Sequence, residues 1–462
     1  MTVTAAPGGA PGSAPAAAEA RARVLRTLGT PPGRLRLSGL VLAVLMLAFG
    51  VTAAWQSDRR AQSADAVVEH SQPLSQDAAE IYRSLADADT TAATGFLLAG
   101  GEPRSVRQRY EQDLDRASEL LARAAARTTA ASDSQRWLSA LNEQLPVYAG
   151  LVETARSYNR QGLPLGGAYL RFASTLMQQQ DQLHPDDPYR AHGMLAAAQK
   201  LYAAETGRLG QDYAGARAVP WAAIGLGVLA LGALVRFQIG LFRRTNRVFN
   251  PGLLAASAAT AAALLWLLVG HSVARADLAD SDRHGAAPLR MLDQARIEAL
   301  QCRGAENLNL VARGSTTQYA DRWDSVTRQL AGSDGSGGTL GASLRLAAGD
   351  TEGTARIQAA AADFRSWDHL HGTAAASNDD GEYQAAVDAT VGQGRAATTD
   401  RAFEQMDHEL AAAVAHEQHD FETAADNGRG ALAGLAVGTG VLAVLAAAGA
   451  LLGIGRRLAE YR

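Results

Sequence analysis

Residues 37–57 read LSGLVLAVLMLAFGVTAAWQS, a run without a single charged side chain. A helix needs about 20 apolar residues to cross the ~30 Å hydrocarbon core of a bilayer. A cleaved signal peptide ending near Ala53-Ala54 is the alternative, but the run is longer than the usual signal core of about 7–15 residues and follows a long leader. Three further charge-free runs follow. The sequence therefore predicts an all-α integral membrane protein with four transmembrane helices, at 37–57, 218–235, 251–274 and 430–455.

The segments outside these runs differ in charge. The tail 1–36, the loop 236–250 and the tail 456–462 together hold 12 Arg and 2 acidic residues. The two long segments are acidic on balance, with 17 basic and 20 acidic residues in 58–217, and 14 and 25 in 275–429. Short Arg-rich segments stay on the cytoplasmic side of a membrane. We therefore expect a multi-pass plasma-membrane protein with a disordered cytoplasmic N-terminal tail, a cytoplasmic loop and C-terminal tail, and two ectodomains outside.

Within both long segments the apolar residues recur at helical spacing. Leu138, Leu141, Leu145 and Tyr148 follow one another in steps of three and four, which places them on one helix face. No stretch shows the sustained alternation of a β-strand. We expect each ectodomain to be an antiparallel four-helix bundle whose outer helices continue into the spans. A short extra helix is expected in the third connection, at 168–180 in one ectodomain and at 382–391 in the other.

The two ectodomain segments resemble each other weakly but in register. Leu97–Gly101 (LLAGG) matches Leu310–Gly314 (LVARG), and at the same offset Tyr110 falls on Trp323. Such self-similarity is typical of repeated units. The pattern predicts a duplication of one helix–module–helix unit.

Patterns typical of catalysis or metal binding are not found. Lys200 follows no glycine-rich loop, and the glycine-rich stretch 332–341 follows no strand, so we interpret it as a linker. His416-Glu417-Gln418-His419 is one residue short of the zinc-protease spacing, which favours surface histidines over a metal site. The single cysteine, Cys302, is expected to be a small buried residue. The sequence predicts no enzymatic activity, no cofactor and no metal.

The fourth apolar run carries glycines at a four-residue spacing. Gly434 and Gly438 form one such pair, and Gly449 and Gly453 form another. Small residues at this spacing let two helices approach closely in lipid. We expect these four glycines to form a packing face of the fourth span.

Bundles that continue into transmembrane helices suit mechanical coupling, since a partner bound outside can bias small movements between helices. The predicted cytoplasmic segments are too short to hold a kinase or cyclase domain. A received signal would therefore pass to another protein. Two alternatives stay open: a stand-alone, chemoreceptor-like sensor that binds a small molecule directly in its ectodomain, and a passive envelope scaffold.

The stretch Tyr158–Ser174, YNRQGLPLGGAYLRFAS, resembles actinobacterial membrane proteins of the GlnX type. The plan of four spans and two ectodomains resembles that family over nearly the whole chain. The resemblance implies a relay between an extracytoplasmic amino-acid-binding lipoprotein, GlnH-like and of the glutamine or acidic-amino-acid type, and a cytoplasmic protein kinase G-like enzyme. Apart from these and the lipid bilayer no partner is implied, and no nucleic acid is expected. The second ectodomain departs from the motif, with Ser377–Gly381 (SNDDG) in its place.

The partner surface is predicted on the irregular connection that carries this motif, at the membrane-distal tip of the first ectodomain. A guanidinium, two amides, an aliphatic side chain and an aromatic ring come together there, and arginine and tyrosine are favoured in binding hot spots. An alternative is that Leu163 and Tyr169 only cap the bundle core. The predicted contact residues are Asn159, Arg160, Gln161, Leu163 and Tyr169.

Overall fold

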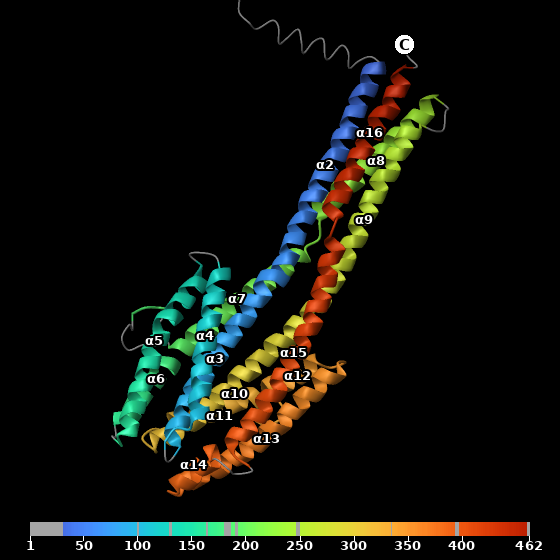
Figure 1. Cartoon of the computed structure of the whole chain (residues 1–462). Helices are drawn as coiled ribbons and strands as arrows, with labels where there is room; N and C mark the ends of the chain where they lie inside the picture. The colour runs from blue at the N-terminus through green and yellow to red at the C-terminus, as the bar shows by residue number, and fades with distance from the viewer. Residues whose placement is uncertain are drawn as a thin grey trace, which may run out of the picture. The chain divides into compact units, whose positions relative to one another are not determined.

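A computed structural model describes most of the chain and divides it into two compact units. Unit 1 contains the described residues of Met1–Ala61, Ala218–Val273 and Ala431–Arg462, and unit 2 contains those of Gln62–Arg217 and Ala274–Gly430. All regular structure in the described residues is helical (Figure 1). The described residues are 31–98, 101–128, 132–162, 165–179, 186–189, 193–245, 250–333, 335–392 and 397–459.

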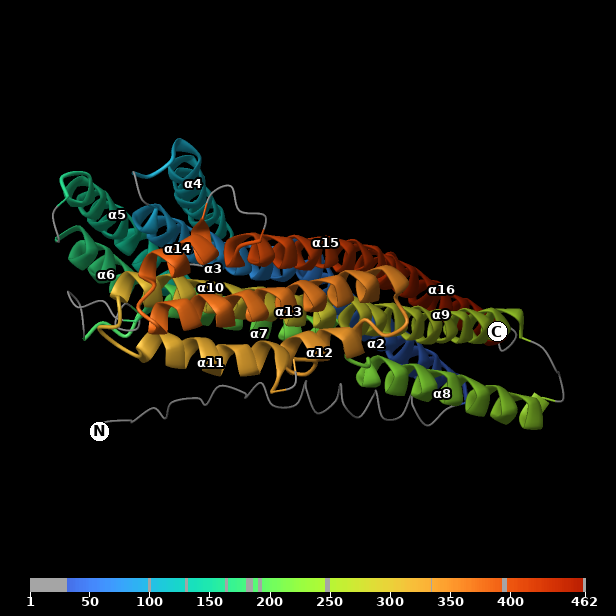
Figure 2. The same ribbon diagram turned by 90° about the horizontal axis from the view of Figure 1, so that it is seen from below.

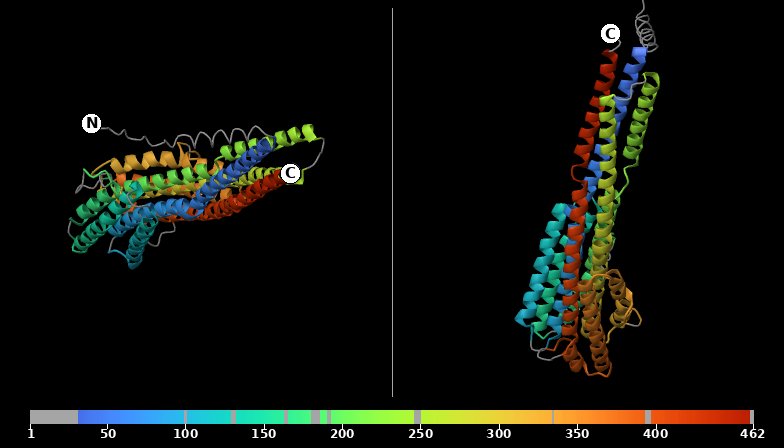
Figure 3. Two further views of the ribbon diagram at one scale, coloured as in Figure 1. Left: turned by 90° about the horizontal axis from the view of Figure 1, so that it is seen from above. Right: turned by 90° about the vertical axis from the view of Figure 1, so that its right-hand side faces the viewer.

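Four helices that lie side by side contribute to unit 1 (Figures 1 and 3), and each is long and apolar enough to cross a membrane. Large apolar side chains point outward from them: Val51 and Leu452 are each 69% exposed, and Val437 is 72% exposed. Water would oppose so much exposed apolar surface, whereas lipid accommodates it. This arrangement indicates a multi-pass membrane protein. The helices are α2 (Pro31–Ala66), α8 (Trp221–Thr245), α9 (Pro251–Ser281) and α16 (Leu435–Ala459).

The helix boundaries differ slightly from the limits of the apolar runs. Helix α8 begins at Trp221, directly after Pro220, although the run begins at 218. The run at 430–455 is interrupted, because α15 ends at Leu432 and α16 begins at Leu435. Gly434 lies in this break with a φ of 76°, a left-handed conformation that only glycine adopts without strain.

Five α-helices begin in the described residues of 62–217, the first half of unit 2. Helix α3 packs against α4 and α7, and α5 packs against α6 and α7. Pro146 lies inside α5 without ending it. The short helix α6 occupies the connection where the extra helix at 168–180 is expected. The helices are α3 (Gln72–Leu97), α4 (Arg104–Arg127), α5 (Asp133–Arg160), α6 (Leu165–Gln178) and α7 (Met194–Ala216).

In the second half, 274–430, six α-helices begin within the part that the structure describes. Helix α10 packs against α11 and α12, and α13 packs against α14. The glycine-rich stretch 332–341 is not a linker throughout, because α12 begins within it at Gly338. Helix α14 begins at Tyr383, within the extra helix expected at 382–391. The helices are α10 (Ala287–Ala312), α11 (Gln318–Ala331), α12 (Gly338–Leu346), α13 (Thr351–Asp379), α14 (Tyr383–Val391) and α15 (Thr399–Leu432).

The two halves are not separate ectodomains but share one compact unit. Helix α3 packs along α10 (Figure 2), and one cluster of buried apolar residues contains side chains of both halves. Asn307 donates to Thr94 Oγ1 over 3.0 Å, and Gln301 donates to the Tyr82 hydroxyl over 2.9 Å. The apolar stripe of a helix does not identify its neighbour, so the sequence predicts the helices without predicting this contact.

A short π-helix precedes the first long helix of each half. These are η1 (Val67–Ser71) before α3 and η2 (Asp282–Ala286) before α10. In both cases a proline, Pro73 or Pro288, stands in the first turn of the α-helix that follows. The wider π turn lets the helix continue although proline supplies no backbone N–H. The chain is therefore helical from α2 to the end of α3, and from α9 to the end of α10.

Candidate functional site

A cavity of about 720 Å³ lies where α3 and α10 both end, opposite the end of unit 2 at which these helices begin. We call it the tip cavity. Both halves line it, together with the start of α4, the end of α5, α6 and the start of α14. Its apolar floor includes Phe96, Leu98 and Leu170, and its charged and amide side chains are Glu102, Arg107, Arg156, Asn159, Arg160, Arg313 and Gln384.

Two of the four arginines of the tip cavity are held in ion pairs. Arg156 is buried and reaches Glu102 over 2.7 Å and Glu153 over 2.6 Å. Arg107 pairs with Glu153 over 3.2 Å. Burial alone would raise the pKa of Glu153, but the hydrogen bonds and charges of Arg156 and Arg107 hold it below its usual range. These ion pairs hold the cavity wall in place, and their opposite charges cancel.

The other two arginines carry positive charge that no described residue neutralises by an ion pair. Arg160 is exposed at the end of α5. Arg313 is exposed at the end of α10, with its guanidinium 4.4 Å from the centre of the Tyr383 ring. It is also the one non-glycine residue with a positive φ, 49°, among the described residues. Backbone strain of this kind costs about 1–3 kcal/mol and clusters at functional sites. The tip cavity is therefore cationic on balance and suits a carboxylate.

The structure brings two of the five predicted contact residues to the tip cavity. Asn159 and Arg160 line it. Gln161 is exposed beside it and donates to the Ser157 carbonyl over 3.2 Å. Tyr169 is half-buried, packs against the core and stacks on Tyr158 with ring centres 5.4 Å apart, which suits the alternative of a core cap. Leu163 lies outside the described residues.

Sequence reasoning missed the cavity residues that lie outside the quoted motif. Arg107 and Arg156 stand on α4 and α5, and Arg313 and Tyr383 come from the second half. One signal was present: the matching blocks Leu97–Gly101 and Leu310–Gly314 both contribute residues to this cavity. The similarity of the two blocks could be read from the sequence, but it did not show that they line the same cavity.

A buried carboxylate anchors the first long helix of each half. On α3, Asp89 accepts hydrogen bonds from Tyr148 over 3.2 Å, Ser174 over 3.1 Å and Gln178 over 2.7 Å. On α10, Glu306 accepts from Trp367 Nε1 over 3.3 Å, His371 Nδ1 over 2.9 Å and Thr399 Oγ1 over 2.9 Å. In each case an aromatic side chain of the third long helix of that half is one donor.

The two anchors differ in charge compensation. Burial raises the pKa of Asp89, and its partners are all neutral donors. Glu306 also contacts the buried guanidinium of Arg303 over 3.3 Å, and Arg303 pairs in turn with Asp400. Although burial opposes ionisation, His371 and Arg303 hold the pKa of Glu306 below its usual range. These networks fix α3 and α10 within their bundles.

In unit 1, two of the predicted packing glycines lie against α9. A Cβ atom added to Gly252 would come within 2.6 Å of Gly449 O and of Gly453 Cα. Asn250 donates to the Gly453 carbonyl over 2.7 Å. Gly438 faces the ring of Trp266, and Gly434 stands in the break before α16. Close approach of α9 and α16 therefore depends on the second pair of glycines.

The single cysteine is shielded from reagents. Cys302 is fully buried, and its sulfur lies 3.6 Å from Thr327 Oγ1. Burial raises the pKa of the thiol to about 12, and only the thiolate is reactive. We expect no labelling of the folded chain by a maleimide at pH 7.5, and stoichiometric labelling in denaturant. Mass spectrometry before and after unfolding measures this, and rapid labelling of the folded chain would contradict the burial.

Among the described residues, no group of three or more His, Cys, Asp or Glu side chains could hold a metal ion. His416 of the HEQH stretch instead contacts Asp350 over 3.0 Å. Asp350 is the N-cap of α13 and accepts from the backbone N–H groups of Glu352 and Gly353. This histidine and its carboxylate thus serve helix capping.

Comparison with known proteins identifies one related domain. Residues 63–214 match the family model of an actinobacterial sensor domain. The match covers the first half of unit 2 from η1 to α7. No curated protein and no solved structure matches the chain. The match supports a sensor-type protein of actinobacteria with a role in sensing or signalling.

Proposed function

We propose that this chain is a non-enzymatic transmembrane signal relay in the plasma membrane. Unit 2 lies outside the cell, and both termini and the basic loop 236–250 lie in the cytoplasm. The charge asymmetry supports this orientation, because the Arg-rich segments adjoin the apolar helices. The matching internal blocks and the shared order of π-helix, long helix and buried anchor support an origin of the two halves by duplication.

One observation carries the proposal: the tip cavity joins the ends of α3 and α10, the two helices that continue without a helical break from α2 and α9. A partner that binds both ends holds these helices in one relative position. Helices in a packed bundle shift as rigid rods by about 1–2 Å, so a bias at one end is felt along the helix. The relay acts through this helix pair.

The proposed outside partner is an amino-acid-binding lipoprotein of the glutamine or acidic-amino-acid type. An acidic side chain on its surface would meet the free guanidinium groups of Arg160 and Arg313, and arginine forms paired hydrogen bonds with carboxylates. The apolar floor around Phe96 and Leu98 would take an aliphatic or aromatic neighbour of that side chain. The proposed inside partner is a protein kinase G-like enzyme that contacts the cytoplasmic segments.

Photocrosslinking tests the partner directly. We replace Asn159 by a photoreactive amino acid in living cells and identify crosslinked proteins by mass spectrometry. An extracytoplasmic solute-binding lipoprotein is the expected product. Crosslinks to lipid alone, or to cytoplasmic proteins, would contradict the proposed partner or the orientation.

Arg160→Ala is expected to weaken binding of the purified lipoprotein at least tenfold and to leave the melting temperature unchanged, because Arg160 is exposed and has no ion pair to lose. The double variant with Arg313→Ala should abolish binding. Arg365→Ala, at an exposed arginine of α13 away from the cavity, is the matched control. Surface plasmon resonance and a thermal melt measure both quantities. Wild-type binding by the double variant would place the interface elsewhere.

A further inference from the structure

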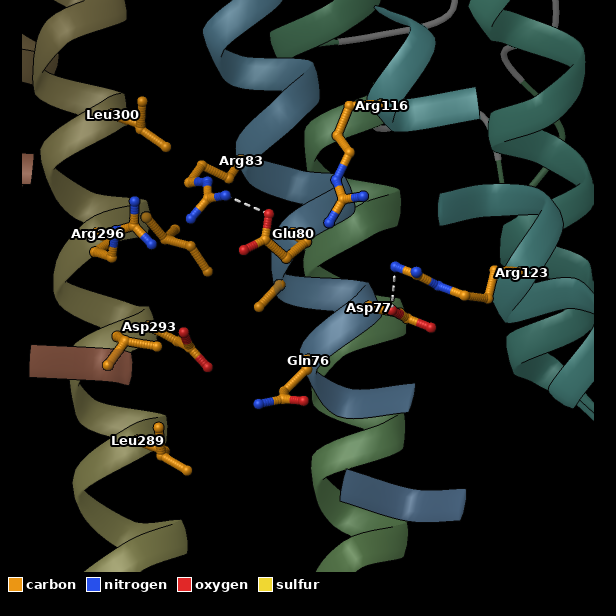
Figure 4. A pocket seen from close by; sticks show the side chains of 13 residues that line it. Gln76, Asp77, Glu80, Arg83, Arg116, Arg123, Leu289, Asp293, Arg296 and Leu300 are labelled. Atoms are coloured by element: carbon orange, nitrogen blue, oxygen red, sulfur yellow. Dashed lines mark hydrogen bonds and ion pairs between the residues drawn. The ribbon is translucent and has the colours of Figure 1, made fainter. Parts of the chain in front are cut away.

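A second cavity, of about 250 Å³, lies between the two halves of unit 2, along the packed faces of α3 and α10 (Figure 4). We call it the seam cavity. Its apolar lining comes mainly from α10, with Leu289, Ile297 and Leu300, and from Val414 on α15. Its polar lining combines carboxyl and guanidinium groups on α3, α4 and α10. Its volume is that of a site for a small molecule.

Most charges around the seam cavity are already paired. Arg123 of α4 contacts Asp77 of α3 over 2.9 Å. Arg296 holds Asp407 of α15 through two hydrogen bonds, of 2.8 and 2.9 Å. These pairs join neighbouring helices and close the cavity walls.

Asp293 is the exception. It lies on α10, and its carboxyl group points across the cavity toward the side chains of α3 (Figure 4). No described residue forms an ion pair with it, since the nearby Arg296 is engaged by Asp407. Burial raises the pKa of Asp293 to about 7, and the nearby charge of Glu80 adds to the increase. A desolvated carboxyl group that no guanidinium holds in an ion pair favours the binding of a positively charged group.

Glu80 and Arg83 face Asp293 from one turn of α3. They form an ion pair with each other (Figure 4). The pair is partly exposed, with 30% and 26% of the two side chains accessible. Such partly exposed local pairs contribute little to stability. A ligand can therefore separate them at little cost and use one group at each of its own charges.

We propose that the seam cavity binds a small zwitterion of the α-amino-acid class, with its ammonium group between Asp293 and Glu80 and its carboxylate on Arg83. A simple amine that bound between Asp293 and Glu80 would draw Glu80 from Arg83 and offer that guanidinium no new partner. A simple carboxylate would face Asp293 and Glu80. A zwitterion offers its ammonium to both carboxyl groups and its carboxylate to the guanidinium, and the pairing of arginine with a carboxylate adds directionality.

This ligand site deepens the proposed function. The effect of ligand binding on signalling rests on that function. Asp293 stands on α10, and Glu80 and Arg83 stand on α3, the same helix pair that the tip cavity joins. A bridging zwitterion would tie the two helices together along their length. The chain would then respond to a free amino acid directly, in addition to its outside partner.

Isothermal titration of the purified full-length chain in detergent tests the proposal. The probes are the L-α-amino acids, each titrated singly, and for every binder the matching amine without the carboxylate and the matching acid without the amine. We expect saturable binding of at least one amino acid and at least tenfold weaker binding of both analogues. The proposal fails if no amino acid binds, or if an analogue with one charge binds as tightly as its parent.

Two variants assign the binding to this cavity. Asp293→Asn and Arg83→Gln should each weaken binding at least tenfold, while Arg365→Ala keeps the wild-type affinity. Asp293→Asn is isosteric, and a circular dichroism melt confirms that each variant is folded. Wild-type affinity in both folded variants would overturn the assignment. The titration contains no partner protein, so failure of the lipoprotein experiments leaves its outcome unaffected, and the reverse also holds.

The pH dependence supplies a second readout. Only ionised Asp293 attracts an ammonium group, so binding should tighten as pH rises from 5.5 to 8. The groups that face Asp293 are Glu80 and Arg83 on α3, Arg296 on α10, Tyr202 on α7 and, through Arg296, Asp407 on α15. Asp293→Asn should remove most of the dependence. An equal pH dependence in the variant would exclude Asp293 as the group that binds the ligand.

Discussion

Glu306→Ala is expected to lower the free energy of unfolding of unit 2 by about 3–5 kcal/mol, because it removes one partner of a buried ion pair. Glu306 and Arg303 are 3% and 1% exposed, so water cannot replace the lost contact. The substitution also leaves the Trp367 and His371 nitrogens without their acceptor. Urea titration of the full-length chain in detergent, followed by tryptophan fluorescence, measures the change.

An exposed ion pair of the same unit provides the control. Arg109 and Glu404 form a pair whose side chains are 46% and 47% exposed. Glu404→Ala should therefore cost at most about 1 kcal/mol. The double variant Arg303→Met, Glu306→Leu should recover part of the loss, because it removes the buried guanidinium together with its buried partner. Equal effects of Glu306→Ala and Glu404→Ala would show that the buried network does not stabilise unit 2.

Much of the helical architecture could be predicted from the sequence, for a physical reason. A bilayer core accepts only long runs without charge, so the four apolar helices are visible in a list of residues. Helix periodicity is equally local: the stripe Leu138, Leu141, Leu145 and Tyr148 is buried on α5 as its spacing predicts. The match to a sensor domain and the four apolar helices agree with a membrane-bound sensor.

The contact between the halves could not be predicted in this way. Whether two bundles stand apart or merge depends on side chains more than 200 positions apart in the sequence, as in the bond from Asn307 to Thr94. The polar residues on the α3–α10 seam look like an ordinary solvated helix face when each helix is read alone. Two residues of the tip cavity, Asn159 and Arg160, could be predicted because they stand on one local motif. Arg313 lies outside that motif and could not be predicted from it.

Polar side chains line part of the seam between the two halves of unit 2. Apolar side chains hold each bundle together, whereas carboxyl groups without full compensation lie between the bundles, on α3, α4 and α10. Burying such groups costs free energy. A ligand or a proton that neutralises these groups should therefore strengthen the contact between the halves.

Four carboxyl groups among the described residues of unit 2 have pKa values raised to about 6 or 7. Burial, together with neighbouring carboxylates, raises the pKa of Asp87 to about 6 and of Asp113 to about 7. Burial likewise raises the pKa of Asp293 to about 7, and of Glu417 to about 7 with the help of Asp350. The charge of Asp87 on α3 contributes to the raised pKa of Asp113 on the adjoining α4.

We expect unit 2 to become less stable as pH rises from 5 to 8. Carboxyl groups with raised pKa values keep their protons in the folded chain between about pH 4 and 7, while the unfolded chain releases them, so stability is lost as pH rises through the folded-state pKa values. The melting temperature should fall by roughly 5–10 °C over this range.

Asp113→Asn should flatten the profile, whereas Glu111→Gln, at an exposed carboxyl group of the same helix, should keep it. Below pH 4.5 the trend should reverse, because Glu306 and Asp407, whose pKa values are held low by His371 and Arg296, then lose their charge. Thermal melts of the full-length chain from pH 3.5 to 8.5 measure how the melting temperature depends on pH. A melting temperature that rises steadily up to pH 8 would contradict the raised pKa values of these carboxyl groups.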